Sequence, residues 1–178
     1  MGLPYGLRDL KVGPYTVSTG VVGVLVDLPN AQTLSFAEKE EFQTLRGDDK
    51  DVAKRGAGPS VDWSLEAGGI TFAALVIFNG GTVTTSGTGS TKKDVYAKTA
   101  SDSRPDFYCE GQAISESGGD FHTVLRRCKA DGGFEGELKD GEFLVTKASG
   151  TAFADFTNRL YEFVENATAI PTPLTAPV

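Results

Sequence analysis

Alternation of apolar and polar residues dominates this chain and predicts a protein built mainly from β-strands. In residues 60–66, the side chains of Val61, Trp63 and Leu65 lie on one side, and the polar residues between them lie on the other. A period of two residues is typical of a strand with one face in a hydrophobic core. We therefore expect a half-buried strand here.

Further strands are expected where apolar or alternating runs are separated by clusters of Gly, Pro, Asn and Asp, which favour turns. The expected strands are residues 7–12, 21–28, 34–45, 107–115, 121–129, 142–147 and 160–165. The last of these has apolar side chains on both faces, so we expect it to be covered on two sides. The spacing of these segments predicts an all-β architecture.

Residues 70–78 predict one α-helix. They follow Gly68-Gly69 and precede Asn79-Gly80-Gly81, where Asn and Gly can adopt the left-handed conformation that closes a helix. The segment is apolar nearly all round, so the helix must be buried across a sheet or against another subunit. A buried strand is the alternative for such a short apolar run. The helix residues expected to make contacts are Ile70, Phe72, Leu75, Ile77 and Phe78.

Two segments lack these patterns and are expected to be long, exposed loops. One is residues 46–59, and the other is residues 80–91, which is rich in Thr, Ser and Gly. Long loops in compact domains often carry function, so we expect contacts with neighbouring subunits. The candidate contact residues of the first loop are Arg46, Asp48, Asp49, Asp51, Lys54 and Arg55. A single domain is expected over residues 1–170, followed by an extended, proline-rich tail at 171–178.

Composition and charge narrow the classes of function. Hydrophobic residues make up 39% of the 178 residues, which suits a folded domain. The net charge is −7 and the longest basic runs are pairs, which argues against tight binding to nucleic acid, because phosphate neutralisation needs clustered Lys and Arg. No run approaches the roughly 20 apolar residues that span a bilayer, and no secretory signal is expected at the start.

Candidate reactive residues are few. Cys109 and Cys128 are the only cysteines, and we expect them to be buried free thiols in a reducing cytosol, with a disulfide between neighbouring strands as the alternative. The single histidine, His122, lies beside Asp120. No nucleophile motif such as Gly-x-Ser-x-Gly accompanies it, so a structural or surface role is expected. The spacing of these residues matches no zinc pattern, and we expect neither catalysis nor a cofactor.

Four segments together carry a resemblance to a known protein family. They are residues 3–12 (Leu-Pro-Tyr-Gly-Leu-Arg-Asp-Leu-Lys-Val), 45–49 (Leu-Arg-Gly-Asp-Asp), 55–70 (Arg-Gly-Ala-Gly-Pro-Ser-Val-Asp-Trp-Ser-Leu-Glu-Ala-Gly-Gly-Ile) and 140–150 (Asp-Gly-Glu-Phe-Leu-Val-Thr-Lys-Ala-Ser-Gly). They resemble, in order along most of the chain, the major tail (tail tube) proteins of long-tailed, non-contractile phages of actinobacteria.

This resemblance implies a β-sandwich or half-barrel with one flanking helix, assembled as hexameric rings that stack into a tube. Inner sheets of neighbouring subunits would join into one barrel around a DNA channel. Residues 70–78 would be the flanking helix, and residues 46–59 would reach an adjacent subunit or ring. The implied partners are further copies of the chain, a tape-measure protein, and tail tip and terminator proteins. The implied location is the virion tail, after assembly in the host cytoplasm.

The acidic charge suggests how DNA could pass through such a tube. A negative wall repels phosphates, so that DNA transits without specific binding. The candidate lumen carboxylates are Glu38, Glu40 and Glu41, and a solvated surface strand is the alternative for this segment. The alternative function is a capsid decoration or head-tail joining protein, which also needs no active site. A small hydrolase using His122 and a ligand-binding barrel are the remaining alternatives.

Overall fold

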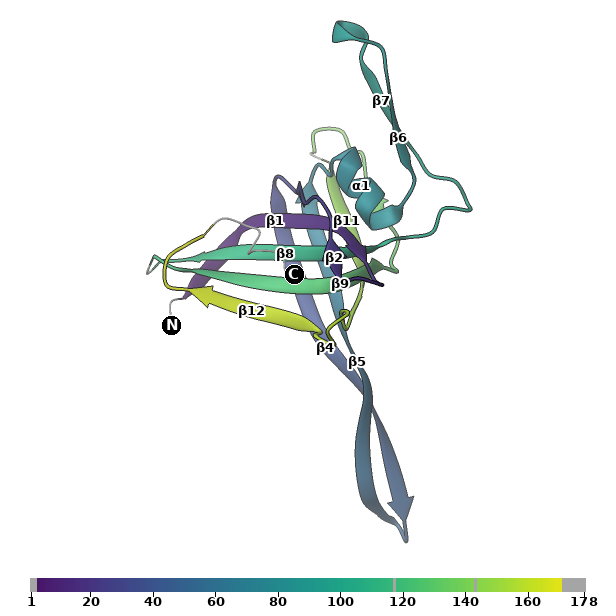
Figure 1. Cartoon of the computed structure of the whole chain (residues 1–178), viewed down its shortest axis with the longest axis vertical. Helices are drawn as coiled ribbons and strands as arrows, with labels where there is room; N and C mark the ends of the chain where they lie inside the picture. Colours follow the sequence, from purple (N-terminus) through teal and green to yellow (C-terminus); the bar gives the residue numbers. More distant parts are fainter. Residues whose placement is uncertain (1–2, 117, 143, 171–178) are drawn as a thin grey trace.

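The computed structural model describes residues 3–116, 118–142 and 144–170. These residues form a mainly β fold with antiparallel strands and one α-helix (Figure 1). The strands are β1 (Pro4–Thr16), β2 (Val21–Val22), β3 (Val26–Asp27), β4 (Ala31–Gly47), β5 (Lys50–Gly68), β6 (Thr82–Ser86), β7 (Lys93–Ala97), β8 (Asp106–Ser115), β9 (Asp120–Ala130), β10 (Glu135–Gly136), β11 (Val145–Phe153) and β12 (Tyr161–Asn166). The helices are α1 (Phe72–Asn79) and the short 3-10 helix η1 (Gly89–Thr91).

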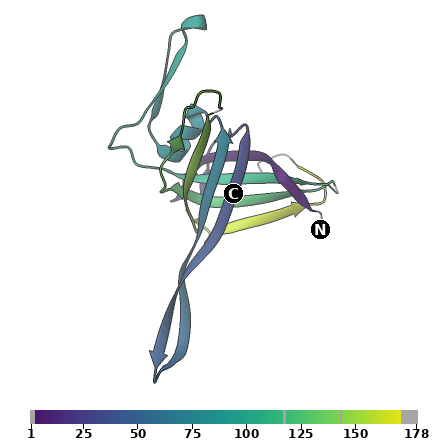
Figure 2. The same ribbon diagram turned by 180° about the vertical axis from the view of Figure 1, so that it is seen from behind.

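Strand β9 is the point at which the main sheet divides. Its first half, residues 120–125, pairs with β12, whereas its second half, residues 127–130, pairs with β11. One layer therefore consists of β1, β8, β9 and β12, and the other continues from β11 to β5 and β4. The strands of the two layers cross steeply, as the front and back views show (Figures 1 and 2). The arrangement is a sandwich-like pair of antiparallel layers.

The hydrophobic core lies between these layers and beneath α1. Val61, Trp63 and Leu65 are at most 3% exposed, which confirms the face predicted from their alternation. The ring of Phe107 meets the rings of Trp63 and Phe78 edge to face, with centroid distances of 5.3 Å and 5.0 Å. These contacts connect β5, β8 and α1 into one packed unit.

Helix α1 confirms the predicted helix and excludes the alternative of a buried strand. Thr71 caps its start, because the side-chain oxygen accepts a hydrogen bond from the Ala74 N–H at 3.3 Å. Gly80, with φ 74°, closes its end as expected. The start was predicted two residues too early, since Ile70 lies before the cap, although it still packs against the core. Leu75, Ile77 and Phe78 are buried, whereas Phe72 is 42% exposed.

The two segments predicted to be loops are instead β-hairpins. Residues 46–59 belong to β4 and β5, which pair up to a two-residue turn at Asp48 and Asp49 with φ 46° and 62°. Residues 82–91 form β6, its turn and η1, and β6 pairs with β7. Both hairpins are exposed on two faces, so their strands carry no apolar alternation that would reveal them.

Smaller differences between the predicted and the observed strands concern where the strands begin and end. The segment predicted at 21–28 contains only β2 and β3, because it folds back on β1, where the Gly23 N–H bonds the Pro14 carbonyl at 2.8 Å. The strand predicted at 142–147 begins at Val145 and runs to Phe153. Phe143 and the predicted tail at 171–178 lie outside the described residues. Strand β12 is not covered on both faces, since Phe163 is 45% exposed.

Gly150 lies where β11 pairs with both layers, opposite Trp63 on β5 and Ala130 on β9. A Cβ atom there would lie 2.1 Å from the Lys129 carbonyl oxygen and 2.7 Å from Trp63 Cζ2. Gly150→Ala should therefore lower the free energy of unfolding by about 1–3 kcal/mol or more, because overpacking forces the backbone to shift. Chemical denaturation of this variant measures the loss. Gly133→Ala is the matched control, since an added Cβ meets nothing within 4 Å. Equal stability of the two variants would contradict the close packing of Gly150 against Lys129 and Trp63.

Candidate assembly surfaces

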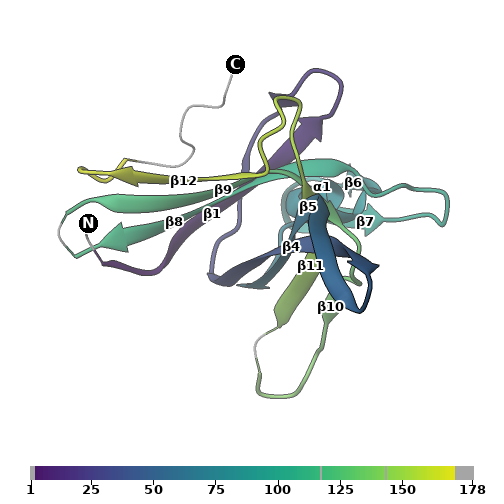
Figure 3. The same cartoon turned by 90° about the horizontal axis from the view of Figure 1, so that it is seen from below.

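The most prominent surface feature is the outer part of the β4–β5 hairpin, residues 39–59, which we call the long arm. It projects away from both layers, as the front and back views show (Figures 1 and 2), and it points along the line of sight in the view from below (Figure 3). Every residue from 39 to 55 is exposed, including Phe42 at 55%, Leu45 at 64% and Val52 at 65%. A two-stranded hairpin with neither face packed is marginally stable in water by itself. Its large apolar side chains therefore form an exposed apolar surface with no core beneath it.

The six residues predicted to contact a neighbour lie at the outer end of this arm. Arg46 Nε and Asp51 Oδ1 form an ion pair of 2.9 Å beside the turn. The Lys54 ammonium lies 4.7 Å from the centroid of the Phe42 ring. These contacts hold the two strands together near the tip, where no core supports them. The members of the set are Arg46, Asp48, Asp49, Asp51, Lys54 and Arg55.

A β-bulge marks the base of the long arm. Lys39 pairs with Ser60 and Glu41 pairs with Ala57, so Glu40 lies opposite both Gly58 and Pro59. Gly58 has φ 68°, a left-handed conformation that glycine adopts without strain. Bulges bend a strand and increase its twist. The bulge thus separates the part of the hairpin that packs on the core from the part that projects.

A second projection, the β6–β7 hairpin, is fixed to helix α1 and is called the short arm. The Tyr96 hydroxyl donates to the Gly80 carbonyl at 2.7 Å, and its ring lies 6.2 Å from that of Phe72. Lys98 Nζ donates to Asn79 Oδ1 at 2.7 Å. The short arm leaves the body toward the end of the molecule opposite to the long arm (Figure 1). The two arms therefore present separate surfaces at both ends of the longest axis.

Several strand edges of the main sheet are open within the described residues. There, β12 pairs with β9 alone, and β4 pairs with β5 alone. In the first part of β1, Pro4 and Tyr5 pair with β8, residues 6–8 lie in a register shift, and none of these residues pairs with a strand on the other side. Open edges present backbone N–H and C=O groups that another strand can satisfy. The layer of β1, β8, β9 and β12 is thus open along β12 and, at its other edge, only at the first part of β1, because β2 and β3 pair with the rest of that strand.

An aromatic cluster lines the opening between the two layers. Phe163 of β12 lies 5.4 Å from Phe36 of β4 and 5.4 Å from Phe121 of β9, measured between ring centroids. Next to it lies an open groove of about 270 Å³, lined in part by Leu7, Leu34 and Phe36. Phe36 and Phe163 are 42% and 45% exposed. This is a second apolar surface beside two open strand edges.

The three candidate lumen carboxylates lie on β4 and are all exposed. Glu38 is at the opening between the layers, where its Oε2 accepts a hydrogen bond from the Tyr161 hydroxyl at 3.0 Å. That bond, together with the charge of Glu38, raises the pKa of Tyr161. Glu40 lies at the bulge, and Glu41 is the first residue beyond it. Their role as a channel wall stays a prediction.

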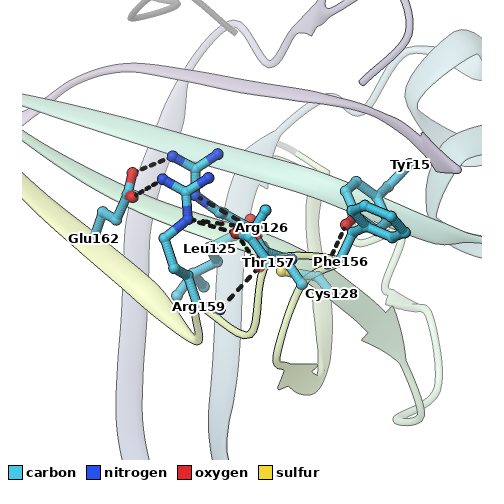
Figure 4. Close-up of polar contacts among 9 residues, drawn as sticks. Tyr15, Leu125, Arg126, Cys128, Phe156, Thr157, Arg159 and Glu162 are labelled. Carbon is cyan, nitrogen blue, oxygen red and sulfur yellow. Dashed lines mark hydrogen bonds and ion pairs between the residues drawn. The ribbon is translucent and has the colours of Figure 1, made fainter. Parts of the chain in front are cut away.

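A network of charged side chains fixes the connection between β11 and β12 (Figure 4). Arg126 on β9 and Arg159 both bond Glu162 of β12, the latter with a contact of 2.6 Å between Nη1 and Oε1. Asp155 accepts hydrogen bonds of 2.8 Å from the backbone N–H groups of Thr157 and Arg159. Burial would raise the pKa of Asp155, but these bonds and the positive charge of Arg159 outweigh it and lower the pKa. The network holds β12 in place on β9.

His122 and the cysteines lie inside the molecule. His122 is 0% exposed, with Glu110 and Asp120 bonded to its two ring nitrogens, so no substrate reaches it. Cys109 and Cys128 are buried and free, as predicted, and the alternative of a disulfide is not observed. Burial, assisted by the charge of Glu110, raises the pKa of Cys109 to about 12, which makes this thiol unreactive.

No protein-family profile matches this chain, and no curated protein sequence matches it either. Among the described residues, no three or more His, Cys, Asp and Glu side chains are grouped so that they could hold a metal ion. The helices of the described part are all too short or too polar to cross a membrane. The exposed arms and open edges are thus the main surface features of the described residues.

Proposed function

We propose that this chain is a structural virion protein that assembles with copies of itself into stacked hexameric rings, forming a phage tail tube through which DNA passes. The observation that carries the proposal is the long arm. It exposes Phe42, Leu45 and Val52 on a hairpin with no core of its own, and such a hairpin becomes stable when a neighbouring molecule covers it.

The open strand edges support the same proposal. In a ring, the edge of β12 in one copy would lie beside residues 4–8 of β1 in the next, and pairing would satisfy the exposed backbone groups of both. Such a contact joins two different surfaces, so it closes into a ring when the rotation between copies allows it. The long and short arms, at opposite ends of the molecule, would then contact the rings above and below.

Charge supports passage of DNA through the proposed tube. The chain has a net charge of −7, and Glu38, Glu40 and Glu41 lie exposed near the base of the long arm. Carboxylates on a channel wall would keep phosphates at a distance. A tape-measure protein and the tail tip and terminator proteins would be the partners that set the length and ends of the tube.

Electron microscopy of the purified chain over a range of concentrations tests this proposal. Hexameric rings or tubes are the expected particles, with two-dimensional averages showing sixfold symmetry. Monomers or trimers that bind only to capsids would contradict the proposal and support a capsid decoration or head-tail joining role. An assay for hydrolysis with wild type and His122→Ala addresses the enzyme alternative, and a turnover lost in that variant would also contradict the proposal.

A further inference from the structure

A small cavity lies where β1, β9 and the connection between β11 and β12 meet. Its volume is about 30 Å³, and the polar side chains in its wall include those of Tyr15, Arg126 and Asp155. Tyr15 and Arg126 are 8% and 6% exposed, and the side chain of Asp155 is 5% exposed. Most of the polar wall is therefore hidden from solvent. We call this space the Arg126 cavity.

One hydrogen-bond donor in the wall of the Arg126 cavity has no acceptor. Arg126 Nε is buried and makes no hydrogen bond to any of the described residues. Asp155 Oδ2 faces it at 3.7 Å, whereas an N–H···O hydrogen bond spans about 2.7–3.2 Å. The other end of the same guanidinium is held, because Arg126 Nη2 bonds Glu162 of β12 (Figure 4). A buried N–H of a charged group is costly to leave unpaired, so this donor calls for an acceptor in the cavity.

The dimensions of the cavity fit one water molecule. An oxygen placed about 2.8 Å from each atom bridges two groups that are 3.7 Å apart. The volume of about 30 Å³ exceeds the roughly 10–15 Å³ that a single water requires. A water at this position would accept a hydrogen bond from Arg126 Nε and donate one to Asp155 Oδ2.

The hydroxyl of Tyr15 provides a third partner in the same wall. It accepts a hydrogen bond from the Phe156 N–H at 2.9 Å (Figure 4), and its own O–H can donate to a further acceptor. Buried waters in proteins typically make about three hydrogen bonds. Arg126, Asp155 and Tyr15 together supply that number, with two donors and one acceptor.

The charges around the cavity favour a water over a halide ion. Asp155 is ionised at neutral pH, because hydrogen bonds and the positive charge of Arg159 lower its pKa. Asp155 and Glu162 match the two positive charges of Arg126 and Arg159. A halide could accept from Arg126 Nε, but it would lie beside the Asp155 carboxylate and could not donate to it. A water has both an acceptor and a donor to offer.

We propose that the Arg126 cavity binds one buried water, which accepts hydrogen bonds from Arg126 Nε and the Tyr15 hydroxyl and donates one to Asp155 Oδ2. This water joins β1, β9 and the connection between β11 and β12. It lies one side chain away from Glu162, and thus from the edge strand β12. The inference goes beyond the proposed function and does not depend on assembly.

The water would attach the connection between β11 and β12 to the rest of the molecule. Within that connection, the Asp155 N–H donates to the Arg159 carbonyl, and Asp155 Oδ1 accepts from the Arg159 N–H, both at 2.8 Å. These two bonds shape the turn but do not link it to β1 or β9. The water and the bond from Phe156 to Tyr15 provide such links.

A crystal structure of the wild-type protein at high resolution tests the occupant directly. We expect a peak of one water within about 3.2 Å of both Arg126 Nε and Asp155 Oδ2. Direct contact between these two atoms with no peak in the cavity would overturn the proposal. Crystals soaked in bromide distinguish an ion from water, because bromide scatters anomalously. An anomalous peak in the cavity would also overturn the proposal.

A cavity-filling variant tests in solution what the water does. Val22 lines the cavity, so Val22→Leu should displace the water and leave Arg126 Nε unpaired. Protection of the Arg159 amide against hydrogen exchange should then fall by about tenfold relative to core amides. Val21→Leu is the matched control, because Val21 is the preceding residue of β2 and is 58% exposed. It should leave that ratio unchanged.

The direction of the change separates a hydrated cavity from an empty one. If the cavity were an empty apolar space, the larger side chain of Val22→Leu would improve packing and keep or raise the protection of Arg159. Protection that is unchanged or higher in Val22→Leu would therefore overturn the proposal. A loss of equal size in Val21→Leu would overturn it as well, because the effect would then not come from the cavity.

Discussion

Replacing Phe107 with Ala should lower the free energy of unfolding by about 3–5 kcal/mol. The side chain is 0% exposed and lies at the junction of β8, β5 and α1, where it meets the rings of Trp63 and Phe78. Its removal leaves a cavity that three different elements would have to fill, and the two aromatic contacts are lost. Domains of this size are stable by about 5–15 kcal/mol, so the variant would be close to unfolding at 37 °C.

Urea denaturation followed by tryptophan fluorescence measures this loss, because Trp63 is the single tryptophan and lies in the affected cluster. Phe42→Ala is the matched control, since the same side chain is removed from a position that is 55% exposed on the long arm. The control should change the stability of the isolated subunit by no more than about 0.5 kcal/mol. A loss at Phe107 no larger than at Phe42 would show that the core is not centred on this junction.

Removing the outer part of the long arm should abolish assembly and leave the subunit folded. The change deletes residues 43–55 and joins Phe42 to Gly56, a paired position, through an Asn-Gly turn that suits a two-residue hairpin loop. Because every deleted residue is exposed, we expect the free energy of unfolding to change by less than about 1 kcal/mol. Electron microscopy should find no rings or tubes, whereas wild type forms them.

A milder variant tests whether apolar contacts cause this effect. Replacing Phe42, Leu45 and Val52 together with Ser keeps the length of the arm and removes its exposed apolar surface. Leu138→Ser is the control, because Leu138 is 85% exposed but lies in the loop between β10 and β11. We expect the triple variant to assemble poorly and the control to assemble normally. Normal assembly of the truncated chain would remove the main support for the proposed function.

The core variant Phe107→Ala and the variants of the long arm probe separate parts of the molecule. The body, with its aromatic junction under α1, determines whether the subunit folds. The long arm adds little to that stability, because only its own two strands touch each other beyond the bulge at Glu40. A protein that keeps such a projection exposed, together with open edges at β12 and β1, has the form expected of a subunit that is completed by its neighbours.

The Arg126 network near the start of β12 and the hydrogen bond from Asn166 Nδ2 to Asp120 Oδ1 near its end together fix both ends of this edge strand. Since β12 is one of the open edges, its exact placement affects how well a second strand could pair with it.

Prediction from the sequence succeeded where one face of an element is buried. The alternation of Val61, Trp63 and Leu65 identified β5 at the core, and Asn79 and Gly80 marked the end of α1. It failed for residues 46–59 and 82–91, which form hairpins exposed on both faces. In those strands neither side selects apolar residues, so charged, Thr and Gly residues look the same as in a loop.

The sequence by itself thus determined that the chain is mainly β, which residues of β5 face the core, and where the single α-helix ends. Only the tertiary structure brought Tyr15, Arg126 and Asp155 together, and only it showed that the predicted loop is a projecting arm. Local periodicity reports the burial of a side chain, because water and core select different residues at each position. Which polar groups meet depends on register between strands far apart in the sequence, and that register is decided by packing of the whole fold.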